Sequence, residues 1–115
     1  MDGDVAKLIL AIVQDEDVLG LNEALIQAGF PGPTRINSAG GFLKQGNVTL
    51  FLGVAASLVP PVLRLIAENC HTRSQYINPL PPMVEASDLN LSYPIEVQVG
   101  GATVFILDVE RYERF

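Results

Sequence analysis

A glycine-rich stretch over residues 37–54 holds the residue types that are best suited to chemistry in this sequence. Gly40-Gly41 lies at its centre and is followed by Phe42 and Leu43. Adjacent glycines let backbone N–H groups converge on one point, and such a nest can bind an anion such as a phosphate. The same glycines would also suit a plain connection between two strands, with Phe42 and Leu43 covering the core. Both interpretations stay open on this pattern alone.

The known phosphate-binding motifs and the usual catalytic groupings are absent from the sequence. No Gly-Lys-Ser/Thr follows the glycines, and no Gly-x-Gly-x-x-Gly occurs. Asp15-Glu16-Asp17 has no further metal ligand nearby and suits the start of a helix, where Asp15 or Asp17 can be the cap. His71 and Cys70 are isolated, and we interpret both as structural. Without a nucleophile–base pair or a metal cluster, we expect a protein that is not an enzyme and needs no cofactor.

Length, charge and cysteine content narrow the class of protein. The chain has 115 residues, and we expect one domain over residues 1–115. A formal net charge of −6 argues against binding polymeric DNA or RNA. The apolar runs are too short to span a membrane, and the acidic residues 1–4 do not begin a signal peptide. The single cysteine fits a cytoplasmic protein without disulfides.

Hydrophobic periodicity predicts the elements that position the glycine-rich stretch. Gly29 is expected to end the first helix in a Schellman cap with Phe30, and Ser57 is expected to cap the second helix. Gly100-Gly101 is expected to be the tight turn of a hairpin, and residues 72–93 a long loop rich in proline. Strands are predicted at 7–14, 34–39, 48–54, 95–99 and 102–109, and helices at 16–28 and 58–70.

The order of these elements predicts an α+β fold. When the first arm of the hairpin is set aside, the order is βαββαβ, the ferredoxin-like sandwich, with the hairpin arm and the long loop as additions. Right-handed crossovers place both helices on one face of the sheet. The first, third and last strands carry apolar residues on both faces, so the helix-free face would expose an apolar surface. We therefore predict an oligomer whose sheets face one another.

Three segments of the sequence resemble the PII-like cyclic di-AMP receptors, which are related to the nitrogen-regulatory PII proteins. They are residues 8–15 of the first strand, residues 40–47 with Thr49 and Gly53-Val54, and residues 100–105 of the last strand. The resemblance covers essentially the whole chain. It implies a cytoplasmic homotrimer of ferredoxin-like subunits with nucleotide sites in the clefts between neighbours. It further implies a signalling protein without known catalysis, whose loops engage a protein partner that the sequence does not name.

The resemblance also implies a set of ligand-binding positions. Apolar and aromatic side chains among them suit the faces of an adenine base. Thr34 and Asn47 can hydrogen-bond the base or the ribose, and Gly41 and Gly53 let backbone N–H groups approach the ligand. Arg35 is available as a cation for the phosphates. The expected cyclic di-AMP site is thus formed by Thr34, Arg35, Gly41, Phe42, Leu43, Asn47, Gly53 and Phe105.

Three positions depart from the family pattern and support an alternative ligand. Gly29 stands where the family usually has an asparagine, and Pro31-Gly32-Pro33 replaces a segment that contains an arginine near the phosphates. Arg114 replaces a glutamine, and Arg35 or Arg114 would have to supply the missing charge. The alternative is therefore a PII-like trimer that binds a different adenine nucleotide or acts as a ligand-free scaffold for protein interactions.

Overall fold

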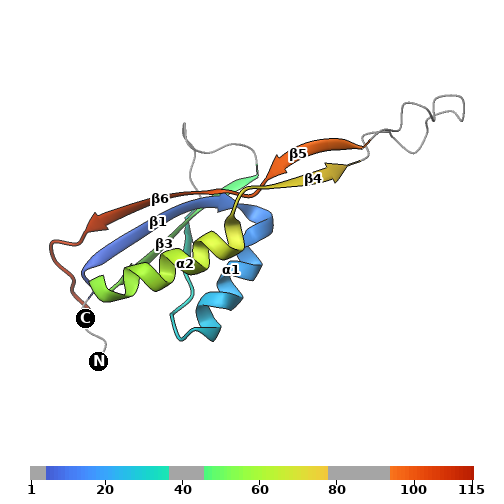
Figure 1. Ribbon diagram of the computed structural model, residues 1–115. Coiled ribbons are helices and arrows are strands. Elements are labelled where there is room, and N and C mark those ends of the chain that lie inside the picture. Colours follow the sequence, from blue (N-terminus) through green and yellow to red (C-terminus); the bar gives the residue numbers. More distant parts are fainter. Residues whose placement is uncertain (1–4, 37–45, 78–93) are drawn as a thin grey trace, which may run out of the picture.

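The computed structural model describes residues 5–36, 46–77 and 94–115, and Figure 1 shows their arrangement. Helices and strands alternate along the chain much as the periodicity predicts. In chain order the elements are β1 (Lys7–Gln14), α1 (Asp15–Gln27), β2 (Thr34–Ile36), β3 (Asn47–Val54), the short 3₁₀ helix η1 (Ala56–Leu58), α2 (Val59–Cys70), β4 (Arg73–Ile77), β5 (Ile95–Val99) and β6 (Ala102–Asp108).

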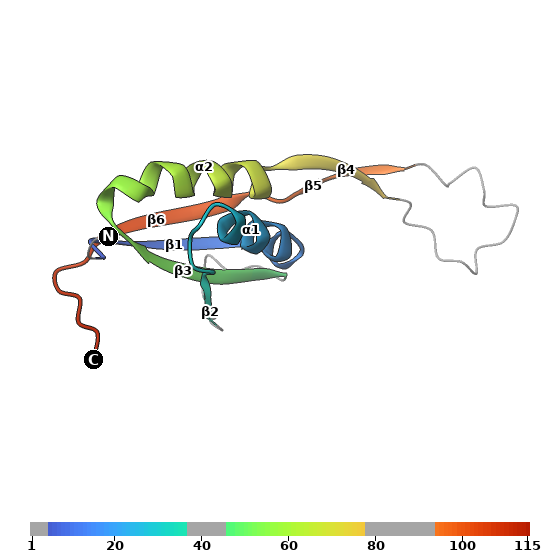
Figure 2. The same ribbon diagram turned by 90° about the horizontal axis from the view of Figure 1, so that it is seen from below.

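A four-stranded antiparallel sheet in the order β2-β3-β1-β6 forms the body of the molecule. Both helices lie on one face of this sheet, as the two views show (Figures 1 and 2). This mixed α+β arrangement is consistent with the predicted ferredoxin-like sandwich. Residues 37–39 of the second predicted strand lie outside the described residues.

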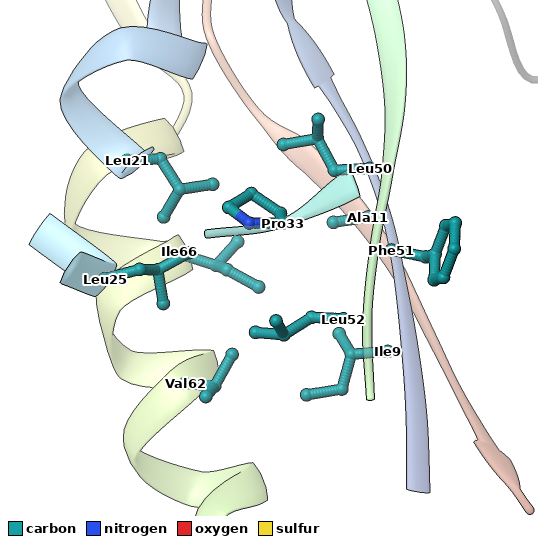
Figure 3. A pocket seen from close by; sticks show the side chains of 10 residues that line it. All are labelled: Ile9, Ala11, Leu21, Leu25, Pro33, Leu50, Phe51, Leu52, Val62 and Ile66. Carbon is teal, nitrogen blue, oxygen red and sulfur yellow. The ribbon is translucent and has the colours of Figure 1, made fainter. Parts of the chain in front are cut away.

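The core lies between the sheet and the two helices. From β1 it receives Ile9, Ala11 and Val13, and from α1 it receives Leu21 and Leu25, all of them nearly inaccessible to solvent. β3 and α2 complete it with Leu50, Leu52, Val54, Val62, Ile66 and Cys70. A cavity of about 10 Å³ within this apolar packing is too small to hold a ligand (Figure 3).

The opposite face of the sheet is free of helices and is also apolar. Leu10 of β1 is paired with Phe51 of β3 on one side and with Phe105 of β6 on the other. Figure 3 shows Phe51 pointing away from the side on which the helices lie. Leu8 and Leu107 form a second pair on this face. The predicted helix-free apolar face is therefore present in the structure.

The C-terminus of α1 is the predicted Schellman cap. The Phe30 N–H donates to the carbonyl of Leu25 at 2.9 Å, and the Gly29 N–H donates to that of Ile26 at 3.0 Å. Gly29 has a φ of 93°, which side chains with a Cβ rarely adopt, and Phe30 packs on the core. The sequence therefore located this helix end correctly.

The predicted N-caps were wrong. Gln14 occupies the cap position of α1, and neither Asp15 nor Asp17 bonds the helix end; both acids lie within its first turn. Ser57 lies in η1, and no side chain caps α2, whose first turn contains Pro60-Pro61 as predicted. Asp17 lacks a capping role because its carboxylate binds an arginine from another element.

The predicted hairpin between the last two strands was also wrong. β5 pairs with β4, in register from Arg73 opposite Val99 to Ile77 opposite Ile95, whereas β6 pairs with β1. Gly100-Gly101 is a bend between two sheets, with φ values of 79° and 95°. The first part of the predicted loop is therefore β4, and residues 78–93 lie outside the described residues. Strand partners are decided by contacts far apart in the sequence, so periodicity alone misassigned them.

Gly20 within α1 and Gly29 just after its end should respond in opposite directions to substitution by alanine. Gly29→Ala should destabilise the protein by about 1 kcal/mol, because the left-handed conformation penalises a Cβ even where space is free. Gly20→Ala lies within α1 and places its Cβ 3.7 Å from the Asn69 Oδ1, an ordinary contact, so it should stabilise by about 0.5 kcal/mol. Urea unfolding measures both changes, and equal effects would contradict this account of the helix end.

Candidate functional site

The sequence-predicted ligand positions fall on three strands and one undescribed segment. Thr34 begins β2, Asn47 begins β3, and Phe105 lies in the middle of β6. Gly53 lies near the end of β3, opposite Leu8. Arg35 follows Thr34 in β2. Three further predicted positions, Gly41, Phe42 and Leu43, lie outside the described residues.

Thr34 and Phe105 point to the same helix-free face but lie at opposite edges of the sheet. The register places Thr34 opposite Phe51, Phe51 opposite Leu10, and Leu10 opposite Phe105. Three strand spacings separate the two edges, which is about 14 Å. Both residues are exposed in the single chain. Within one subunit, a bound base therefore cannot contact both of them.

Arg35 does not lie on the same face of the sheet as Thr34 and Phe105. Because side chains alternate along a strand, it points to the face that carries the helices, opposite Leu50. Its Nη1 lies 3.0 Å from the Oδ1 of Asp15 at the start of α1. Both side chains are half exposed, so this ion pair contributes little stability. Arg35 can therefore leave Asp15 at little cost in free energy.

Gly53 was expected to let a ligand approach, and in the structure it leaves room for a side chain of its own chain. A Cβ on Gly53 would come within 2.9 Å of the Cγ1 of Val5. Val5 precedes β1, and the bond from the Ala6 N–H to the Val54 carbonyl, at 3.0 Å, holds this segment beside β3. The absence of a side chain at Gly53 therefore leaves room for Val5 beside β3.

Asn47 lies at the end of the sheet where the glycine-rich stretch enters β3. It is half buried and lies opposite Gln14, the last residue of β1. The adjacent Gly46 carbonyl accepts a bond of 2.7 Å from the Asp15 N–H. Gly46, where the glycine-rich stretch enters β3, is thus attached to the first turn of α1.

Sequence reasoning missed an ion pair between Asp17 and Arg73. Asp17 is buried, and its Oδ1 lies 2.9 Å from the Nη2 of Arg73. The spacing of Asp17, Leu21 and Leu25 was a usable signal, because residues four apart share a helix face and the two leucines belong to the core. An acidic residue in line with a buried stripe requires a cation, and Arg73 provides it.

The described residues include a groove that lies away from the predicted positions. It has a volume of about 290 Å³ and lies between the end of α2 and the start of β6, with His71 and Thr72 at its polar end. Over the same residues, no three His, Cys, Asp or Glu side chains gather as metal ligands. A helix of bilayer-spanning length and apolarity is not found in the described part of the chain.

Comparison with protein families shows which family this chain belongs to. A model of the cyclic-di-AMP receptor family matches residues 6–115, which include every predicted ligand position. The chain belongs to the cyclic-di-AMP receptor family. The resemblance seen in the three sequence segments is thereby confirmed.

A solved structure also resembles this receptor-family chain over nearly its whole length. It is the crystal structure of a functionally unknown protein from Pediococcus pentosaceus ATCC 25745. The two chains share 39% sequence identity with a TM-score of 0.76, and the match covers 98% of this chain and 100% of the other. The likeness supports the fold described above.

Gly53 and Val5 should be energetically coupled. Gly53→Ala should destabilise the protein by about 1 kcal/mol, because the new methyl group forces Val5 away from β3. Adding Val5→Ala should recover most of that loss, because it removes the atoms in conflict. Urea unfolding of both single variants and the double variant measures the coupling, and strictly additive effects would contradict it.

Proposed function

We propose that this protein is a cytoplasmic PII-like signalling protein that binds cyclic di-AMP between the subunits of a homotrimer and relays this state to a partner protein through its loops. Family membership supports the ligand class. The observation that carries the subunit-interface site is the position of Thr34 and Phe105 at opposite edges of one sheet face. A neighbouring subunit offers the way to bring one edge next to the other. The proposed role is binding without catalysis.

The helix-free face supports the trimer. Phe105 and Leu107 are 40% and 43% exposed in the single chain, and Leu10 lies between Phe105 and Phe51 in the row that crosses the sheet. Contact between such faces removes apolar surface from water, which favours association. Subunits that meet through their sheets would also bring their sheet edges close together.

A single charged substitution on the apolar sheet face tests the subunit contact. The unmodified protein should sediment as a trimer at micromolar concentration, and Leu10→Lys should sediment as a monomer, because it places a charge at the centre of the apolar face. Ile26→Lys is the matched control, since Ile26 is 55% exposed on α1 and away from the sheet face. A monomeric unmodified protein, or a trimeric Leu10→Lys variant, would refute the proposed assembly.

The exposed aromatic ring of Phe105 supplies the surface on which an adenine base can stack. Thr34 and Asn47 supply polar groups for the base edge or the ribose. The phosphates require a cation. Arg35 can provide it after leaving its exposed pair with Asp15, and Arg114 in the exposed C-terminal segment is the second candidate.

Calorimetric titration with cyclic di-AMP tests the ligand, with cyclic di-GMP and ATP as comparison nucleotides. Saturable binding of one cyclic di-AMP per subunit is expected. Phe105→Ala should weaken it about tenfold or more, because base stacking is lost. Ile106→Ala is the matched control, since Ile106 is next in the same strand and 45% exposed but points to the other face. Equal weakening by the two variants would contradict the assigned role of Phe105.

A second candidate function keeps the trimer and changes the ligand. Gly29, at the family's usual asparagine position, has a φ of 93° and serves to end α1. Pro31-Gly32-Pro33 then leads into β2 without the family's arginine. Both features favour another adenine nucleotide, or a scaffold without ligand. Binding of ATP in place of cyclic di-AMP would select the first of these, and binding of neither nucleotide would select the scaffold.

A further inference from the structure

The two-stranded arm of β4 and β5 projects from the body beyond the end of α2 (Figures 1 and 2). Within the described ranges, these two strands pair only with each other. An isolated pair of strands has little stability of its own. The direction of the arm must therefore be set where it joins the body, at Thr72 and at Gly100-Gly101.

The first strand of the arm is held by the ion pair between Arg73 and Asp17. Arg73 begins β4, and its two terminal nitrogens face the two carboxylate oxygens of Asp17, with Nη2 to Oδ1 at 2.9 Å and Nη1 to Oδ2 at 3.4 Å. Nη1 also donates to the His71 carbonyl at 3.2 Å. A two-point contact of this kind fixes the orientation of the guanidinium plane as well as its distance.

The second strand of the arm is held at the same place. The Gly100 N–H donates to the Oε1 of Gln14 at 2.6 Å, and the Gly101 N–H donates to the Cys70 carbonyl. Gly100 has a positive φ, and a Cβ at this residue would collide with Arg73 Nη1 and the His71 carbonyl. The bend between β5 and β6 is thus folded closely around the guanidinium of Arg73.

We propose that Asp17 and Arg73 form a clamp that fixes the direction of the arm, and that Arg73 is a positioning residue whose release lets the arm base open without unfolding of the body. The clamp lies next to the point where the glycine-rich stretch enters β3. Gln14, which holds Gly100, lies opposite Asn47, and the neighbouring Asp15 N–H bonds the Gly46 carbonyl. A change in this stretch can therefore reach the arm through the start of α1. This last link rests on the proposed function, whereas the clamp itself does not.

Cys70 is a natural reporter of the arm base. It is the one cysteine of the chain and is fully buried, and its carbonyl accepts the bond from Gly101. Burial raises the pKa of its thiol to about 11, with a further contribution from the nearby Asp17 carboxylate. The thiol therefore reacts slowly at pH 8 while the base is closed. Its rate of modification measures how often the base opens.

Modification of Cys70 by a disulfide reagent at pH 8, in the full-length protein without ligand, tests the clamp. Arg73→Lys keeps the charge but loses the two-point contact, so modification should become about tenfold faster. Asp15→Asn is the control, because it breaks an ion pair of the same helical turn outside the arm base, and its Cys70 should react as fast as that of the wild-type protein. If Cys70 in Arg73→Lys is modified no faster than in the wild-type protein, the proposal is overturned.

The urea dependence of the same reaction separates local opening from global unfolding. If the arm base opens locally, the modification rate of Arg73→Lys should rise only weakly with urea, because little surface is exposed. A slope as steep as that of global unfolding would mean that the ion pair only stabilises the whole fold. That outcome would overturn the clamp whether or not cyclic di-AMP binds.

Discussion

The structure depends on β1, a central strand whose two faces are both apolar. Ile9, Ala11 and Val13 form the centre of the core on one face, while Leu8 and Leu10 lie on the other. A central strand of this kind needs a neighbour on each edge and a cover on each face. β3 and β6 supply the edges, and the two helices cover one face. No helix among the described residues covers the second face, and this is the physical basis for the proposed association through it.

Association would also bring the predicted ligand positions of neighbouring subunits together. Thr34 and Phe105 belong to the same face but to edge strands on opposite sides of the sheet. Inside one subunit they are too far apart to share a base, and they become useful together only when the edges of two sheets meet. The apolar face and the separation of the predicted ligand positions are then both explained by one assembly.

One end of the sheet gathers most of the polar organisation. Gln14 pairs with Asn47 and holds Gly100, and Asp17 holds Arg73 three residues further along. The entry to β3 and the root of the arm therefore share the first turn of α1. Acidic residues suit this turn because of the helix dipole, and here the buried one also neutralises an arginine from another element. The same short segment thus serves the helix, the glycine-rich stretch and the arm.

Local patterns in the sequence determined β1, both helices and the Schellman cap at Gly29, because periodicity and glycine conformation act over a few residues. Motif spacing also determined the family. Tertiary structure alone decided the pairing of β4 with β5, the contact of Val5 with Gly53, and the ion pair of Asp17 with Arg73. Each of these joins residues that lie far apart in the chain. Their energies depend on how the sheet brings them together, so no local preference could specify them.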